Sequence, residues 1–88
     1  MSVVEIEKED ITKYKITPAN QDRTEELLDK LKSALRLGNE FKSKTTITFM
    51  TEKGPKKVTT TIWSLTGEYL QLKAGVIIPV RSIIDVNY

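Results

Sequence analysis

The chain of 88 residues contains no cysteine and no histidine. Without cysteine there is no disulfide framework, no thiolate nucleophile and no zinc knuckle. Without histidine the commonest general base and metal ligand is missing, and no serine has a residue of that kind to activate it. The segment Gly54-Pro55-Lys56-Lys57 lacks the spacing of a phosphate-binding loop. The sequence therefore predicts a protein that is not an enzyme and that holds no metal and no cofactor.

Long apolar runs are also absent. No run approaches the roughly 20 residues that a membrane-spanning helix needs, so no membrane partner is expected. The first residues, Met-Ser-Val-Val-Glu-Ile-Glu, have neither the basic start nor the apolar segment of a signal peptide. No linker long enough to separate two domains is visible. We predict a cytoplasmic protein with one domain over residues 1–88.

Neither positive nor negative charge is in large excess. The net charge is +2, with seven Lys or Arg and eight Asp or Glu in residues 1–38, and seven and four in residues 39–88. The C-terminal half is therefore mildly basic and the N-terminal part mildly acidic. An imbalance of this size is no argument for a nucleic-acid partner.

The first sixteen residues allow two interpretations. Val4 and Ile6 alternate with glutamates and can add a short strand, or residues 1–15 form a loose arm anchored by apolar residues such as Ile11. Acidic residues cluster here, and carboxylates suit Ca²⁺ or Mg²⁺, but the loop spacing of an EF-hand is missing. We favour a solvated acidic arm over a cation site formed by Glu5, Glu7, Glu9 and Asp10.

Residues 17–37 carry the pattern of an amphipathic helix. Thr17-Pro18 is a suitable first turn, Asp22 with Glu25 offers a second start, and Gly38 is a suitable C-terminal stop. The apolar stripe either docks a partner helix or covers the protein's own core. We favour the second for Leu27, Leu28, Leu31, Ala34 and Leu35. Phe41 is expected to plug the junction with the following strands.

Five segments between residues 43 and 88 combine β-branched or aromatic residues with alternating polarity. The first three turns between them each contain glycine. Pro79 cannot donate to a strand ladder and is expected at a sheet edge or a bulge, while Arg81-Ser82 leaves room for one 3₁₀ turn. The sequence predicts five antiparallel strands, at 45–51, 57–65, 69–73, 76–80 and 83–88.

A flat sheet of five short strands would leave two edges and one face open, and curling covers both. The predicted fold class is therefore mainly β (α+β). An N-terminal helix at 17–37 is followed by a five-stranded antiparallel meander at 43–88, which curls into a small, partly open barrel. The helix is expected to close one opening of that barrel.

This order of elements resembles the Sm-like and SH3-like small barrels. The stretch from Glu68-Tyr69-Leu70-Gln71-Leu72 through Gly75 to Ile78, Ile83, Ile84 and Val86 is similar to the C-terminal half of the Rho-binding antiterminator family. A weaker match runs from Ile16-Thr17-Pro18 to Asp22 and Glu26-Leu27, where the cysteine usual in that family is missing. The resemblance implies inhibition of the Rho helicase, or contact with another RNA-processing protein, through helix and barrel.

Sm-like RNA sites rely on an Asp and an Asn around a turn and on an Arg-Gly pair before the last strand. This chain has Thr66 and Gln71, then Pro79-Val80, at the corresponding places. The uridine-reading residues of that family are therefore not present here.

The candidate binding surface is the outward face of the second and third predicted strands, flanked by basic residues. Aromatic side chains next to cations can stack bases and neutralise phosphates. The competing interpretation, which we favour, is that Trp63 and Tyr69 pack under the helix or against adjacent strands. The surface comprises Thr59, Thr61, Trp63, Tyr69, Gln71 and Lys73, with Lys56, Lys57 and Arg81 at its margins.

Three functions fit this pattern. The first is a small non-catalytic module that binds a protein or single-stranded RNA. The second is a self-assembling structural protein that pairs edge strands 76–80 and 83–88 of neighbouring copies, although Pro79 disfavours continuous pairing. The third is an accessory domain whose partner the sequence does not specify.

Overall fold

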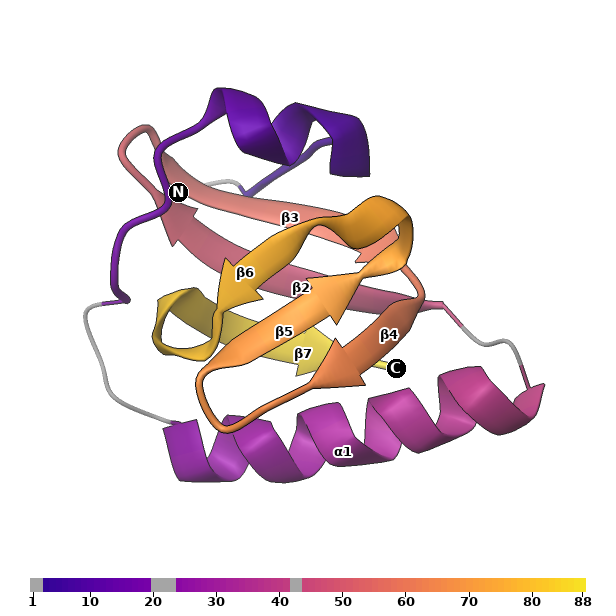
Figure 1. Cartoon of the computed structure of the whole chain (residues 1–88). Coiled ribbons are helices and arrows are strands. Elements are labelled where there is room, and N and C mark those ends of the chain that lie inside the picture. The colour runs from indigo at the N-terminus through magenta and orange to yellow at the C-terminus, as the bar shows by residue number, and fades with distance from the viewer. Residues whose placement is uncertain (1–2, 20–23, 42–43) are drawn as a thin grey trace.

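A computed structural model describes residues 3–19, 24–41 and 44–88. In these residues the protein is mainly β, with two sheets and one α-helix, which confirms the α+β class (Figure 1). The four-stranded sheet has the order β1-β3-β2-β7, and its strands are Val4–Glu5, Gly54–Thr60, Thr45–Thr51 and Ile83–Asn87. The three-stranded sheet has the order β4-β5-β6, with strands Ile62–Leu65, Tyr69–Leu72 and Ile77–Pro79.

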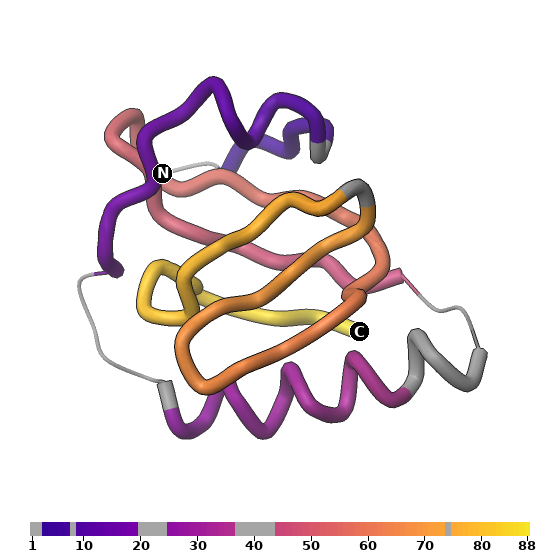
Figure 2. The backbone as a smooth tube through the Cα atoms, in the orientation of Figure 1, coloured from indigo at the N-terminus to yellow at the C-terminus, as the bar shows by residue number. Residues whose placement is uncertain are grey.

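The predicted five-stranded meander is not what forms, because the predicted strand 57–65 divides at Thr61. Its first part is β3 of the four-stranded sheet, and its second part is β4 of the three-stranded sheet. The Lys73 amide donates a hydrogen bond to the Thr61 carbonyl at 3.0 Å, so the backbone between β3 and β4 is still bonded to the chain at the end of β5. The smooth backbone path in Figure 2 passes directly from one sheet to the other at this point.

The turns lie where they are expected, but the first is shorter than predicted, because β3 begins at Gly54 and not at residue 57. The β2–β3 hairpin is tight, with only Glu52 and Lys53 between the strands, and Gly54 follows with φ 99°. The η2 turn at Lys73–Gly75 ends on Gly75 with φ 80°. Pro79 lies on the edge strand β6, and a 3₁₀ corner, η3 at Val80–Ser82, precedes β7, which confirms both predictions.

The helix α1, Thr24–Phe41, packs against β4, β7 and η3. Leu27, Leu31 and Ala34 are buried and Leu28 and Leu35 are half-buried against the core, so the apolar stripe covers the protein's own interior. Figure 1 shows the helix lying along one side of both sheets. The alternative of a partner-binding leucine stripe is therefore wrong for these side chains.

The helix bounds differ from the predicted 17–37. Thr17 and Pro18 are outside the helix because this segment bonds to β2 and to η3: the Thr17 amide donates to the Met50 carbonyl, and the Ala19 amide to the Arg81 carbonyl. At the other end the helix continues past Gly38, since one glycine costs a helix only about 1 kcal/mol. Asp22 and the Phe41 side chain lie outside the described part of the structure.

The N-terminal segment is not a loose arm in residues 3–19. β1 runs parallel to β3, the η1 turn Lys8–Lys13 follows, and Ile11 within it is 1% exposed. The Lys56 ammonium nitrogen lies over the ring of Tyr14, 5.6 Å from the ring centroid. The predicted short strand forms, and Ile11 is an anchor as predicted, but the segment between these contacts is not loose. The Asp10 carboxylate, 2.9 Å from the Lys13 ammonium, raises the pKa of that lysine by a hydrogen bond.

The core lies between the two sheets, with α1 on one side and η1 supplying Ile11 from another (Figure 1). No helix among the described residues is long and apolar enough to cross a bilayer. Among the described residues, no helix or strand covers the face of β4, β5 and β6 that points away from the core (Figure 1).

Candidate interaction surface

The outer face of β4-β5-β6 follows from strand alternation. In β5, Leu70 and Leu72 are buried while Tyr69 and Gln71 point outward, and in β6 Ile78 is buried between Ile77 and Pro79. The strand register places Gln71 between Ser64 and Ile77, and Tyr69 beside Pro79. We use "outer face" below for Trp63, Ser64, Tyr69, Gln71, Ile77 and Pro79.

A β-bulge lies at Trp63 and determines which of the residues after it reach this face. Ile62 pairs with Leu72 and Ser64 with Gln71, so Trp63 is the extra residue between two paired positions. A bulge of this kind locally interrupts the alternation of sides. As a result Trp63 and Ser64 are both exposed, while Ile62 is buried and Leu65 turns back to pack on the core.

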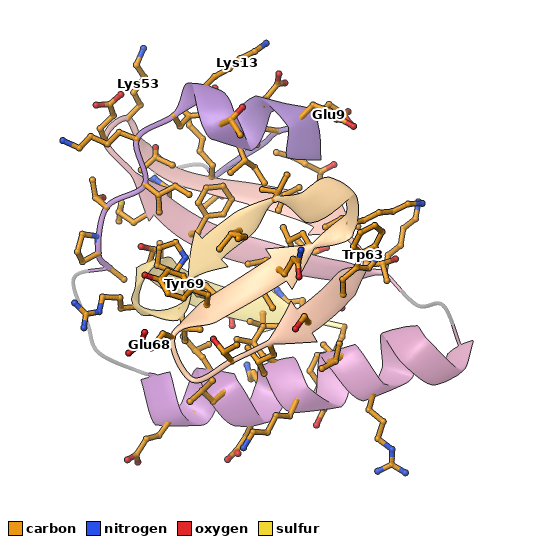
Figure 3. All side chains as sticks on the ribbon, in the orientation of Figure 1. Glu9, Lys13, Lys53, Trp63, Glu68 and Tyr69 are labelled. Carbon is orange, nitrogen blue, oxygen red and sulfur yellow. The ribbon has the colours of Figure 1, made fainter. Side chains whose placement is uncertain are left out.

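Three large apolar side chains on the outer face remain half exposed: Trp63 at 53%, Tyr69 at 50% and Ile77 at 53%. Burial under the helix, one branch of the favoured interpretation, is wrong for both aromatic side chains; the other branch, packing against adjacent strands, fits Tyr69, which lies beside Pro79. Figure 3 shows the two aromatic side chains toward opposite ends of the three-stranded sheet, with Glu68 near Tyr69. Ile77 lies beside Gln71, so the outer face carries exposed apolar side chains along its length.

The remaining predicted surface residues do not gather there. Lys73 follows β5 in η2, and Arg81 lies in η3 two residues after Pro79; both are exposed, at different margins of the outer face. Thr61 is the half-buried residue between the sheets. Thr59 belongs to the four-stranded sheet, where its hydroxyl lies 2.9 Å from that of Thr46.

Lys56 and Lys57 are also separated from the outer face. Both lie in β3 between β1 and β2, opposite Val4 and Glu5 in the register. Lys56 is half-buried over Tyr14, and the Lys57 carbonyl accepts the Ile6 amide at 2.9 Å. The predicted continuous surface, with its three flanking cations, is therefore divided between two sheets.

Sequence reasoning missed Ile77 and Pro79 as members of the outer face. Both were assigned to an edge strand, and the alternation around the buried Ile78 already places them on one side of it. What the sequence lacks is the register, because only the pairing of Gln71 with Ile77 brings that isoleucine beside the aromatic side chains.

The described side chains offer no constellation for metal binding. No group of three or more acidic, cysteine or histidine side chains in the described ranges is placed to hold a metal ion. Asp85 is 3.4 Å from the Lys30 ammonium and links β7 to the helix, while the Glu68 carbonyl accepts the Val80 amide. These contacts tie elements of the fold together.

Comparison with protein-family models, with curated proteins and with solved structures finds no match to this chain.

Proposed function

We propose that this protein is a non-catalytic binding module that contacts a protein partner through the outer face. The observation that carries the proposal is the half exposure of Trp63, Tyr69 and Ile77 on one face of one small sheet. Aromatic side chains supply large contact areas at low cost in conformational entropy and dominate protein interfaces. Gln71, in the middle of the face, adds a hydrogen-bonding group with defined neighbours on both sides.

A protein partner is favoured over single-stranded RNA by the positions of the cations. RNA binding needs basic side chains along the path of the backbone, beside the rings that stack on bases. Of the four predicted cations, Lys56 and Lys57 belong to the other sheet, and Lys73 and Arg81 border the outer face. The proposed surface is accordingly mainly apolar, with Gln71 in its middle and isolated charges at its margins.

We further infer that the two sheets together form a small, partly open barrel of the Sm-like or SH3-like kind. The inference is supported by the direct passage of β3 into β4 at Thr61, by the 3₁₀ corner η3 before β7, and by the helix across β4 and β7. Kinship with the Rho-binding antiterminators would make an RNA-processing protein the partner. Fold alone does not fix function, so that kinship stays a prediction.

The proposal is tested by photo-crosslinking in cells of the source organism. A benzoylphenylalanine replaces Trp63 in one variant and Tyr69 in another. The control variant carries it at Ser33, an exposed position on α1. We expect discrete protein adducts from positions 63 and 69 and none of the same mass from position 33.

Two results would contradict the proposal. Adducts that disappear on nuclease treatment would identify RNA as the partner. Adducts with the mass of two copies, together with a dimer or ring in light scattering, would favour the self-assembling alternative through strands 76–80 and 83–88.

A further inference from the structure

One side of strand β6 has no strand next to it among the described residues, since β6 is the edge of the β4-β5-β6 order. The Leu72 amide donates to the Val76 carbonyl at 2.7 Å, and the Val80 amide donates to the Glu68 carbonyl at 2.9 Å. In an antiparallel ladder bonded and non-bonded pairs alternate. Positions 77 and 79 are therefore non-bonded pairs with β5, and their backbone groups point toward the open edge.

This edge has a defined hydrogen-bonding pattern. Ile77 presents one N–H and one carbonyl, whereas Pro79 presents a carbonyl only. Soluble proteins protect edge strands with charged side chains, with proline or by keeping them short. The run Val76-Ile77-Ile78-Pro79-Val80 has no charged side chain, so Pro79 and the short length of β6 are its protection. The exposed Ile77 side chain also lies on the outer face, so the edge and the face form one continuous surface.

We propose that an extended segment of another protein adds to β6 as a fourth strand and places apolar side chains beside Ile77 and Tyr69. This rests on the proposed function and specifies the conformation of the partner. The facing segment donates N–H groups to the Ile77 and Pro79 carbonyls and accepts the Ile77 N–H. Addition of a strand to an exposed sheet edge is a general mode of peptide recognition.

A second copy of this chain fits the edge less well. If two β6 strands pair with Ile77 opposite Ile77, the Pro79 carbonyl faces position 75, which lies in the η2 turn with φ 80° rather than in a strand. If Ile77 faces Pro79 instead, the Ile77 carbonyl meets a residue without an N–H. A segment without proline at the facing positions can bond to all three groups.

The exposed area also favours a short segment. Two half-exposed aromatic side chains and one isoleucine leave about 300 Å² of apolar surface, whereas a stable interface between folded proteins buries about 800 Å² on each partner. A strand adds main-chain hydrogen bonds that do not require a large apolar area. The partner is therefore expected to be a linear segment and not a globular surface.

The test selects ligands for the full chain from a display library of short random linear peptides, and measures their affinity for two variants. Ile77→Ala removes the exposed side chain and keeps the N–H. Ile77→Pro removes both. The proline should be tolerated in the fold, because position 77 makes no ladder bond to β5 and Val76 already has φ −74° and ψ 134°, the conformation favoured before proline.

We expect the selected peptides to alternate apolar residues and to lack proline at the positions that face β6. Ile77→Ala should lower the affinity of these peptides severalfold. Ile77→Pro should lower it about tenfold further, because one hydrogen bond is lost and its partner is left unsatisfied. In the wild-type chain, the bound peptide should slow hydrogen exchange of the Ile77 amide. This last measurement keeps the test valid if the proline variant does not fold.

The outcomes separate the two proposals. One outcome is that Trp63→Ala lowers the peptide affinity, that Ile77→Pro and Ile77→Ala lower it equally, and that the bound peptide does not slow exchange of the Ile77 amide. In that case the outer face binds the peptide but the strand inference is wrong. An absence of any selected peptide would also overturn the strand inference, and the crosslinking experiment would still decide the proposed function. Peptide affinities that do not change on substitution of Trp63, Tyr69 or Ile77 would contradict both the proposed function and the strand inference.

Discussion

At the scale of single residues, Ile62 and Trp63 are neighbours with opposite environments. Ile62 is 1% exposed in the core, and Trp63 lies on the outer face at the bulge. A sequence alone predicts that adjacent strand residues point to opposite sides. It does not predict the bulge, because a bulge depends on how many residues of the partner strand stand opposite. Alternation therefore places Trp63 on the side opposite Ile62, whereas the exposure of Ser64 and the inward position of Leu65 follow from the bulge.

The first prediction compares these neighbours. Ile62→Ala should lower the free energy of unfolding by about 2–4 kcal/mol because it leaves a cavity in the core. Trp63→Ala should lower it by less than about 1 kcal/mol, since half of the side chain is already in water. Urea unfolding followed by circular dichroism measures both. Equal losses for the two variants would show that Trp63 supports the core.

The second prediction concerns Thr51, which is buried at the β2–β3 hairpin. Its hydroxyl donates to the Gly54 carbonyl at 2.7 Å and accepts the Lys53 amide at 3.2 Å. Thr51→Val should cost about 1–3 kcal/mol of unfolding free energy, because two backbone groups lose their partner. Thr46→Val is the matched control: it removes the exposed contact with Thr59 and should cost less than about 0.5 kcal/mol. An equal unfolding free energy for Thr51→Val and the control would contradict this role of Thr51.

At the scale of elements, the edge strand β6 is limited by Pro79. The third prediction is that Pro79→Val adds an outward N–H and so makes the edge more competent to pair. Light scattering should then detect self-association of the variant at concentrations where the wild-type chain is monomeric. The selected peptides should also bind the variant more tightly. An unchanged monomer with unchanged peptide affinity would show that the edge is covered in solution.

The fourth prediction concerns the turns that join the strands. Gly75 has φ 80° with nothing near the place of a Cβ atom, so Gly75→Ala should cost about 1 kcal/mol through backbone strain alone. Gly67 has equally open surroundings without a positive φ, and Gly67→Ala should be close to neutral. Thermal unfolding of the two variants measures the difference. A larger loss at Gly67 would contradict the described turn geometry.

Elements with strong periodicity were predictable, and their boundaries were not. The stripe of Leu27, Leu31 and Ala34 identified the helix and its buried side. Its start was misplaced because Thr17 and Ala19 bond to Met50 and Arg81, which are distant in sequence. The division of the predicted strand 57–65 was likewise invisible, because the run keeps its β-branched character through Thr61.

At the scale of the whole molecule, the layers determine which surface is left for a partner. The helix covers β4 and β7 on one side, and the N-terminal segment adds β1 to β3 and inserts Ile11 into the core. In the described structure no element covers the outer face of β4-β5-β6 (Figure 1). The sequence indicated the helix as a cover for the core, but the packing of the N-terminal segment rests on long-range contacts that have no local signature.

The most direct test of the central claim is an NMR spectrum of the isotopically labelled chain in a cell extract of its source organism. Binding of a large partner broadens the signals of the residues it contacts. We predict selective broadening at Trp63, Tyr69, Gln71 and Ile77, unchanged signals at Ser33 on the helix, and recovery on protease treatment but not on nuclease treatment. Broadening confined to α1, or removed by nuclease, would contradict a protein-binding outer face.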